Sequence, residues 1–295
     1  VAHLRRVLLT TPAPAPVAAP APASPHAAPA ASLIIPSGGR ADLLAACLAS
    51  LPASPDLDIV VIDNGPDDSP ASALLAACRD RRLRVARDAG PFNFSRLCNA
   101  GAAMARAPLL VFLNDDVEAR DSDWLALMAH WARRPDVGAV GAKLLYPDGR
   151  LQHGGVVLGM GGRAGHFERF AGPDAPGYFG RLAAPHDISA VTGACLAVEA
   201  WKFAAVGGFD ARNLPVDLND VDLCLRLAER GWRCVLEPRA RLIHHESASR
   251  GDDLRGERRY GAEIAWFRRR WARELGDDPY FHPALSLETT AAALA

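Results

Sequence analysis

An uninterrupted apolar run that ends in two acids is the feature that most constrains this sequence. Five large apolar residues, Leu109–Leu113, are followed at once by Asn114, Asp115 and Asp116. A run of this kind is typical of a central strand that is covered on both faces, as in parallel sheets. Ligands of such sheets bind at the carboxyl ends of the strands. The two acids therefore mark the edge where we expect a ligand.

Strand-like runs and helical patterns alternate along the rest of the chain. We expect strands near residues 33–35, 59–62, 83–86 and 234–236, regular structure again at 190–196, and helices near 43–51, 74–78, 97–104, 264–271 and from Asp220 onwards. This alternation predicts an α/β fold with a parallel sheet. Residues 146–185 are rich in glycine and proline without a sustained period, so we expect loops and short strands that frame a second substrate.

The chain divides into one large domain and two short ends. Residues 1–31 consist largely of proline and alanine from Thr11 onwards, which predicts an extended linker or the tail of an upstream region. Residues 32–285 are expected to form one catalytic domain, and residues 286–295 a C-terminal tail. Because the first residue is Val1 rather than methionine, we expect a trimmed chain or the downstream part of a longer polypeptide.

Charge, cysteine content and hydropathy exclude several classes of protein. The 33 Lys and Arg residues balance 34 Asp and Glu residues, so no global basic field favours nucleic acid. Six cysteines without paired CxxC spacing predict free thiols in a reducing compartment. No stretch reaches the ~18 apolar residues of a membrane span. We expect a cytoplasmic protein, with peripheral association at the inner face of a membrane as its closest approach to lipid.

Several polar residues at predicted strand ends are candidates for binding. Asp115 and Asp116 suit a divalent cation, which takes one or two carboxylates plus substrate phosphates, although an acidic helix cap is the alternative. His244 follows another apolar strand and is placed to complete a metal shell, while a lone histidine there is more often structural. Asp63 with Asn64 can bind a nucleotide base or ribose, but Asn-Gly also signals a turn.

Further candidates lie in two other places. Ser37 and Arg40, after the first strand, can serve phosphates. Asp220 and Asp222 begin a helix, and residues two apart on a helix diverge, so different roles are expected. A hydroxyl acceptor needs a carboxylate base within roughly 2.6 to 3.2 Å of its proton, and Asp220 is the candidate. For Asp222 the favoured interpretation is stabilisation of the positive helix end.

In this order the motifs resemble those of the family-2 glycosyltransferases, most closely the bacterial rhamnosyltransferase-like members that act on cell-surface polysaccharides. The resemblance covers residues 32–283. Its motifs lie at residues 33–37, 61–65, 91–95 with Asn99, 113–116, 192–195, 207–210, 219–226 and 244–250. Gly38 and Gly39 stand where the family carries more polar residues, which predicts a flexible loop and weak donor affinity.

The resemblance implies a GT-A fold, with a central, mostly parallel sheet flanked by helices. It also implies an inverting transfer from a nucleotide-diphosphate sugar to a hydroxyl of a saccharide or lipid-linked saccharide, as in O-antigen-like synthesis. The implied cofactor is Mn²⁺ or Mg²⁺ on Asp116 and His244, and Asp220 is the implied general base. The implied donor-binding residues are Pro36, Ser37, Arg40, Asp63, Asn64, Asn99, Asn114 and Asp115. The implied acceptor-binding residues are Gly193, Ala194 and Asn219.

Two other interpretations stay open at this point. A carbohydrate- or nucleotide-binding relative with weak or no catalysis would keep the same fold, because a fold alone never proves activity. A sugar nucleotidyltransferase shares the alternating architecture and the metal. That class typically needs a glycine-rich loop with arginine and a downstream lysine around a triphosphate, and residues 36–40 do not supply that loop.

Overall fold

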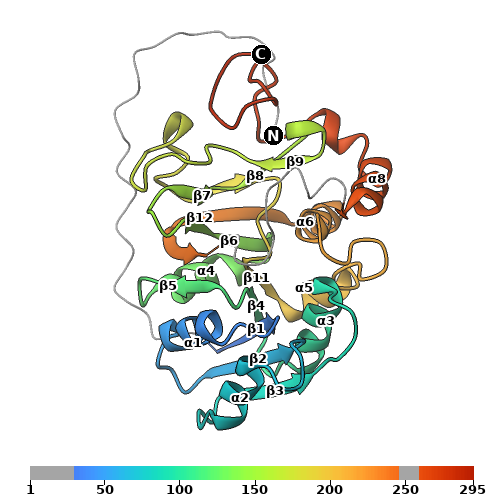
Figure 1. Ribbon diagram of the computed structural model, residues 1–295. Helices are drawn as coiled ribbons and strands as arrows, with labels where there is room; N and C mark the ends of the chain where they lie inside the picture. Colours follow the sequence, from blue (N-terminus) through green and yellow to red (C-terminus); the bar gives the residue numbers. More distant parts are fainter. Residues whose placement is uncertain (1–29, 246–258) are drawn as a thin grey trace.

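A computed structural model describes residues 30–245 and 259–295 and shows one large sheet between helices (Figure 1). Within these residues the sheet has ten strands, in the order β10-β12-β6-β11-β4-β1-β2-β3, with β5 paired to β12 and β7 to β6. The strands are β1 (Ala31–Ser37), β2 (Leu57–Asp63), β3 (Leu83–Arg87), β4 (Leu109–Leu113), β5 (Val117–Ala119), β6 (Val137–Leu145), β7 (Leu151–His153), β10 (His186–Ile188), β11 (Cys195–Glu199) and β12 (Arg233–His244).

The sheet is parallel through its first four strands. β1 pairs in parallel with β2 and β4, and β2 pairs in parallel with β3. β11 runs antiparallel between β4 and β6, and β12 is again parallel to β6. Strands β1 to β4, β6 and β12 therefore point the same way, which confirms the predicted α/β fold with a mostly parallel sheet.

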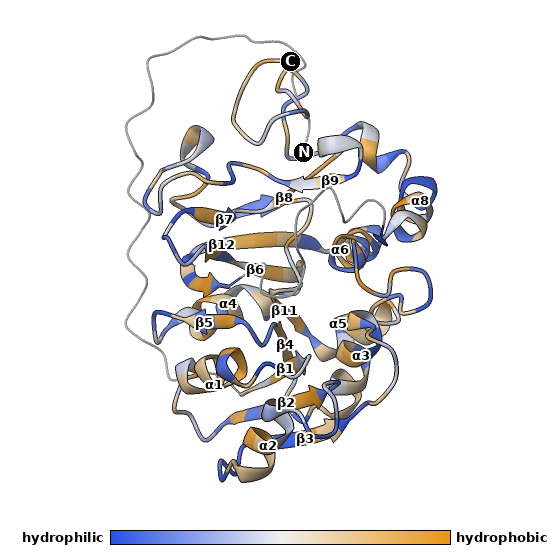
Figure 2. Cartoon of the chain, in the orientation of Figure 1, coloured by the Kyte–Doolittle hydropathy of each residue, from blue (hydrophilic) through white to orange (hydrophobic). Residues whose placement is uncertain are grey.

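Helices cover both faces of the sheet (Figure 1). They are α1 (Ala41–Ser50), α2 (Pro70–Ala77), α3 (Phe94–Met104), α4 (Trp124–Ala132), α5 (Ala200–Ala205), α6 (Asn219–Glu229) and α8 (Gly261–Arg270). Leu33 and Ile35 pack in one core cluster with α1, α2 and α4, whereas Ile34 packs in another with α3, α5, α6 and α8. Successive side chains of a strand point to opposite faces, so β1 contributes to both cores. Hydrophobic colour accordingly follows the strands in Figure 2.

The first strand is longer than the sequence predicts. We expected a strand near residues 33–35, but β1 continues through Pro36, which pairs with Ile62, to Ser37. Pairing with β4 ends at Ile34, so Pro36 lies where β1 has a partner on one side only. Proline is tolerated where its missing N–H faces away from a ladder.

The irregular segment before β11 forms a small unit that packs against the large sheet. It contains the two-stranded sheet of β8 (Val156–Leu158) and β9 (Ala164–His166) and the 3₁₀ turns η1 (Met160–Gly162) and η2 (Tyr178–Gly180). The expectation of loops and short strands is confirmed. Residues 286–295, expected as a tail, lie against this unit after η3 (Glu274–Gly276): Gly161 N–H donates to Leu287 O (3.1 Å) and Glu168 N–H to Thr290 O (2.6 Å).

Other expectations about the whole chain have different outcomes. The predicted linker lies outside the described residues up to position 29, and Ala31 already belongs to β1 and is buried. All six cysteines are free thiols, as predicted, and five are buried. In the described parts of the chain, every helix is too short or too polar to cross a membrane.

Candidate active site

The candidate site lies where the parallel strands end. Ser37 closes β1, Asp63 closes β2, and Asn114 follows β4, so the three side chains meet at one edge of the sheet. The Asn114 N–H donates to Ala194 O (3.0 Å), which joins this edge to the loop before β11. The sheet order thus places the predicted donor residues beside a predicted acceptor residue.

The longest strand of the sheet delivers His244 to the two acids. β12 ends at His244, whose Nε2 lies 3.1 Å from Oδ1 of the buried Asp116. Its other nitrogen, Nδ1, lies 2.6 Å from Oε1 of Gln152 on β7, and Gln152 Nε2 donates back to His244 O (3.3 Å). An amide oxygen only accepts, so Nδ1 carries a proton, and in the neutral ring Nε2 then keeps its lone pair. Asn114 Nδ2 lies 3.3 Å from that Nε2.

The pair formed by Asp116 and His244 fits a divalent cation. A carboxylate oxygen and an imidazole lone pair 3.1 Å apart repel each other unless a metal cation or a proton lies between them, so the neutral ring and Asp116 can share a cation. Hydrogen bonding of the remote nitrogen to a second residue, here Gln152, is the usual arrangement of a metal-ligating histidine. Within residues 30–245 and 259–295 no group of three or more His, Cys, Asp or Glu side chains could hold a metal. Substrate phosphates and water would therefore complete the shell.

Asp115 lies beside this pair in a different environment. Burial raises its pKa to about 6, and the charge of Asp116 adds to that rise, while the Ser37 hydroxyl and the Gly38 N–H oppose it. The Gly38 N–H donates to Asp115 Oδ2 at 3.3 Å. Arg40, the predicted phosphate contact, is half-exposed and pairs with Asp42 (2.6 Å). Its role toward a phosphate stays a prediction.

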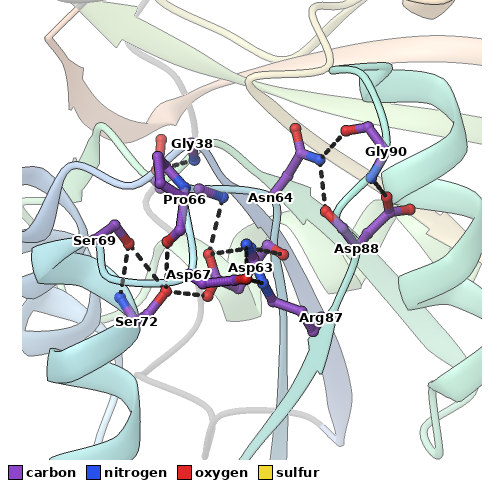
Figure 3. A network of polar contacts seen from close by, with 12 residues as sticks. Gly38, Asp63, Asn64, Pro66, Asp67, Ser69, Ser72, Arg87, Asp88 and Gly90 are labelled. Carbon is purple, nitrogen blue, oxygen red and sulfur yellow. Dashed lines mark hydrogen bonds and ion pairs between the residues drawn. The ribbon is translucent and has the colours of Figure 1, made fainter.

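Asp63 and Asn64 are anchored by the turn that follows β2 (Figure 3). Asp63 is only 3% exposed and accepts hydrogen bonds from Gly65 N–H (3.0 Å) and the Ser72 hydroxyl (2.6 Å). Asn64 Nδ2 donates to the carbonyls of Asp88 (2.7 Å) and Gly90 (2.8 Å). These contacts hold the ends of β2 and β3 together, and the predicted role of Asp63 and Asn64 in donor binding stays a prediction.

The second glycine after β1 is required by its backbone conformation and lies close to the loop after β2. Gly39 has a φ of +102°, and a Cβ on Gly65 would lie 2.8 Å from the Gly39 Cα. Real Cβ atoms essentially never come that close to a backbone carbon, so the loops after β1 and β2 need glycine here. The positive φ of Gly39 thus explains one of the two departures from the family pattern, whereas a Cβ on Gly38 would meet nothing within 4 Å and that glycine has no structural explanation.

The candidate base lies at the first turn of α6. Asp220 Oδ2 accepts from Gly193 N–H (2.7 Å), and Oδ1 accepts from Val221 N–H (2.8 Å). Leu218, which precedes the helix, has a φ of +59°, a left-handed conformation that is uncommon for a large residue and that clusters at functional sites. The Glu263 carboxylate on α8 accepts from two consecutive N–H groups in residues 216–217, both at 2.8 Å, and so holds this entry loop.

Asp222 has a structural position. It is fully buried and accepts hydrogen bonds from Trp271 Nε1 (2.9 Å) and Arg226 Nε (2.8 Å). Burial raises its pKa, and the Arg226 charge opposes this. Asp222 therefore ties α6 to the end of α8, a firmer structural role than stabilising the helix end.

One cavity of about 400 Å³ joins the two chemical groups. Its lining includes His244 and Asp220, together with the predicted residues Asn114, Gly193, Ala194 and Asn219. The other predicted residues are not part of this lining: Pro36, Ser37, Arg40, Asp63, Asn64, Asn99, Asp115 and Asp116. Further walls come from β8–β9, within the segment expected to frame a second substrate, and from residues 287–290 of the C-terminal segment, which the sequence did not indicate.

Asn99 has a local partner at both ends of its amide. Nδ2 donates to Phe209 O (2.9 Å) and Oδ1 accepts from Phe209 N–H (2.9 Å), which fixes α3 to the loop after α5. Gln152 and Glu263 are the positioning residues that sequence reasoning missed. Gln152 lies 92 positions from His244, which it orients, and no local sequence pattern predicts a contact between residues so far apart. The predicted motif beyond His245 lies outside the described residues.

Comparison with solved structures identifies the class of fold as GT-A. A mannosyltransferase from Pyrobaculum calidifontis, solved with GDP-Man and Mn²⁺, matches with a TM-score of 0.60 at 18% identity over 86% of this chain and 67% of that one. GalNAc-T7, solved with UDP, GalNAc and Mn²⁺, matches with a TM-score of 0.59 at 13% identity over 86% and 58%.

Residues 32–169 match the model of glycosyl transferase family 2, which confirms the expected resemblance. The chain is 42% identical to protein y4gI of Sinorhizobium fredii over 88% of the chain and 29% of that protein. It is 40% identical to the O-antigen biosynthesis protein RfbC of Myxococcus xanthus over 90% of the chain and 21% of that protein. An N-acetylglucosaminyl-diphospho-decaprenol L-rhamnosyltransferase of Mycobacterium tuberculosis is 31% identical over 49% of each chain. The chain thus spans less than a third of the first two relatives.

Proposed function

We propose that this chain transfers a sugar from a nucleotide-diphosphate donor to a hydroxyl of a saccharide acceptor, with inversion, in cell-surface polysaccharide synthesis. The observation that carries the proposal is the single cavity lined by both His244 and Asp220. A base on one side and a group that holds the leaving phosphates on the other side are what a direct displacement needs. The resemblance to an O-antigen biosynthesis protein supports the pathway.

Asp220 is proposed to take the proton of the acceptor hydroxyl. Its two oxygens already accept N–H bonds from Gly193 and Val221, so the carboxylate is held in one orientation before the acceptor arrives. Preorganisation of this kind avoids the cost of ordering the base during the reaction. A carboxylate that takes the proton while the sugar bond breaks opposite it yields one displacement and inversion of the anomeric centre.

Asp116 and His244 are proposed to hold Mn²⁺ or Mg²⁺. When bound, such a cation neutralises the charge that develops on the departing nucleoside diphosphate. Gln152 keeps the His244 lone pair aimed at Asp116, and Asn114 supports the same nitrogen. The two solved neighbours that contain Mn²⁺ support this cofactor.

The acceptor is proposed to be a saccharide or a lipid-linked saccharide, handled at the inner face of a membrane from the cytoplasmic side. A related rhamnosyltransferase is named for a lipid-linked saccharide, which supports this class. Donor binding is proposed to involve the strand-end residues, with Asp63 at the base, Asp115 at the ribose, and Ser37 and Arg40 at the phosphates.

The test measures nucleoside diphosphate released from UDP-, dTDP- and GDP-sugars with Mn²⁺ or Mg²⁺, with chelator added in parallel. Chelator-sensitive release from one donor supports the proposal and identifies the nucleotide. Release that chelator leaves unchanged contradicts the metal role, and pyrophosphate formed from sugar phosphate and nucleoside triphosphate would indicate a nucleotidyltransferase. The anomeric configuration of the product, read by NMR coupling constants, tests inversion.

A further inference from the structure

A loop in the C-terminal segment supplies one wall of the cavity. Its residues 287–290 line the same cavity as the candidate base Asp220. The chain folds back on itself around them, because Ser286 N–H donates to Ala293 O (2.8 Å). Residues 286–293 therefore form a closed loop, called here the C-terminal loop, whose tip faces the candidate base.

Two backbone hydrogen bonds attach the C-terminal loop to the β8–β9 unit. Gly161 N–H donates to Leu287 O (3.1 Å), and Glu168 N–H donates to Thr290 O (2.6 Å). Leu287 also packs against the apolar cluster that contains Met160. The two residues between these attachments are therefore held on a fixed backbone at the edge of the cavity.

The residue that holds one side of the loop is in an uncommon backbone conformation. Glu168 has a φ of +59°, which is rare outside glycine and clusters at functional sites. Its carboxylate accepts a hydrogen bond from Tyr178 N–H (2.6 Å), and its Oε2 lies 4.0 Å from Nε of Arg181. Both the backbone and the side chain of Glu168 thus hold this wall of the cavity in place.

Glu288 brings a negative charge to the tip of the loop. It is exposed, belongs to the lining of the cavity, and donates its N–H to Ser286 Oγ (3.2 Å). An ionised carboxylate only accepts hydrogen bonds, and its two oxygens can accept from two hydroxyls of one sugar ring. The same charge repels a carboxylate on a ligand.

We propose that the C-terminal loop selects the acceptor, and that the Glu288 carboxylate accepts hydrogen bonds from hydroxyls of a neutral acceptor sugar. A charged group at the edge of a site discriminates by attraction to one ligand and repulsion of another, here a neutral sugar against a uronic acid. The loop lies beyond residues 32–169, so the match to the family model does not specify it. The inference deepens the proposed function and rests on it for the saccharide nature of the ligand.

Selectivity is measured by NMR titration of the ¹⁵N-labelled full chain. The probes are the methyl glycosides of glucose, galactose and mannose, each paired with the methyl glycoside of its uronic acid. We expect at least one neutral glycoside to shift the amide signals of Thr289 and Thr290. It should bind about fivefold more tightly than its uronic acid partner, the effect of one like charge about 4 Å away in water.

Two variants separate the charge of Glu288 from its size. Glu288→Ala should weaken binding of the neutral glycoside about tenfold, for the loss of a hydrogen bond to a charged group. Glu288→Gln keeps the size and removes the charge, so the affinities for the two members of each pair should become similar. A purely structural role would not change that ratio. Glu229→Gln, at an exposed site outside the cavity lining, is the control and should keep the native affinities.

Three results overturn the proposal: equal affinity of Glu288→Ala and the native chain, an unchanged ratio in Glu288→Gln, or no shift with any glycoside. These measurements need no turnover, so they test the loop even where no nucleotide sugar is consumed. Absence of turnover in the native chain would instead count against the proposed function. Where a donor and an acceptor are both active, the acceptor KM should rise about tenfold in Glu288→Ala while the donor KM stays constant.

Discussion

The two halves of the site are held together in different ways. In the donor half, polar residues at the strand ends bond to the turns that follow the same or neighbouring strands, as Asp63 bonds to Gly65 and Ser72 and Asn64 to Asp88. In the acceptor half, contacts from separate elements hold the candidate residues, as Gly193 before β11 holds Asp220 and Glu263 on α8 holds the loop before α6. The donor half therefore owes its geometry to parallel strands and their turns, whereas the acceptor half owes it to long-range packing.

Substitutions at the site should therefore fall into two groups. Some change the transfer reaction, and others change the stability of the surrounding structure. Replacing a residue whose polar atoms all bond to other parts of the fold, as those of Asn99 do, should lower the stability of the protein. A residue that faces the cavity, as Asp220 does, has an oriented group that a substrate can meet. The predictions below test this division from the largest expected effect to the smallest.

The largest effect is expected for Asp220→Asn. Removal of the base should lower the transfer rate by roughly 10² to 10⁴-fold, because an amide cannot take the acceptor proton. Donor affinity, measured by calorimetry with Mn²⁺, should stay within about twofold, since the amide keeps the size of the side chain. Glu229→Gln, on the exposed end of the same helix, is the matched control and should keep full rate. Full turnover by Asp220→Asn would remove this residue from the mechanism.

A smaller effect is expected for Gln152→Leu. Without the amide oxygen, the His244 ring loses the contact that sets its tautomer and orientation, and Mn²⁺ affinity should fall roughly 10- to 100-fold. Calorimetry with Mn²⁺ measures this without any turnover. Gln152→Glu retains an acceptor for Nδ1–H and should bind Mn²⁺ at least as well as the native chain. Unchanged affinity in the leucine variant would show that Gln152 does not position the metal pair.

The sequence predicted the donor half of the fold well because each strand there is a local apolar run. The apolar runs at Leu109–Leu113 and at residues 59–62 predict β4 and β2 without any knowledge of the rest of the chain. β6 was missed, although it is fully buried over nine residues. Two of these nine are glycines, and a Cβ on Gly141 would lie 2.5 Å from Val191. Glycine lets β6 pack closely against its neighbours, but glycine has a low propensity for strands. The sequence pattern therefore does not predict a strand here.

Sequence reasoning reached the chemical groups of the site more readily than their supports. The candidate residues follow apolar strands or begin a helix, as Asp116, Asp220 and His244 do. Such positions can be recognised from the sequence alone. Gln152 and Glu263 act from other elements, and their partners are known only once the chain is folded. The wall from residues 287–290 was missed because a short segment without a hydrophobic period gives no indication that it packs against the domain.

Asn99 tests whether a residue belongs to the supporting structure or to the donor site. Resemblance predicts a donor-binding residue, whereas both ends of its amide bond the backbone of Phe209. Asn99→Ala should lower the free energy of unfolding by about 2 kcal/mol, for two lost hydrogen bonds, with an unchanged donor Kd. Denaturant unfolding and calorimetry measure the two quantities. A large rise in donor Kd at unchanged stability would return Asn99 to the donor site.

The smallest effect is expected at the far end of the donor half, where Asp58 joins three strands. Its carboxylate accepts from Arg84 (2.7 Å), the Ser32 hydroxyl (2.7 Å) and Arg106 N–H (3.0 Å). Burial on its own raises the pKa of Asp58, but the bonds from Arg84, Ser32 and Arg106 outweigh it and leave the pKa below its usual value. Asp58→Asn should therefore lower the free energy of unfolding by about 1 kcal/mol at pH 7.

The effect of Asp58→Asn on the free energy of unfolding should depend on pH. A carboxyl whose pKa is depressed by folding contributes stability above the unfolded value of about 3.9, and that contribution disappears as the pH falls through the folded value. The difference in unfolding free energy between the native chain and Asp58→Asn should be constant from pH 7 to about 5 and shrink below about 4. Transfer activity at pH 7 should not change, because Asp58 lies at the opposite ends of the strands from the site. A difference that grows toward acid pH would mean that the buried carboxylate strains the donor half instead of joining its strands.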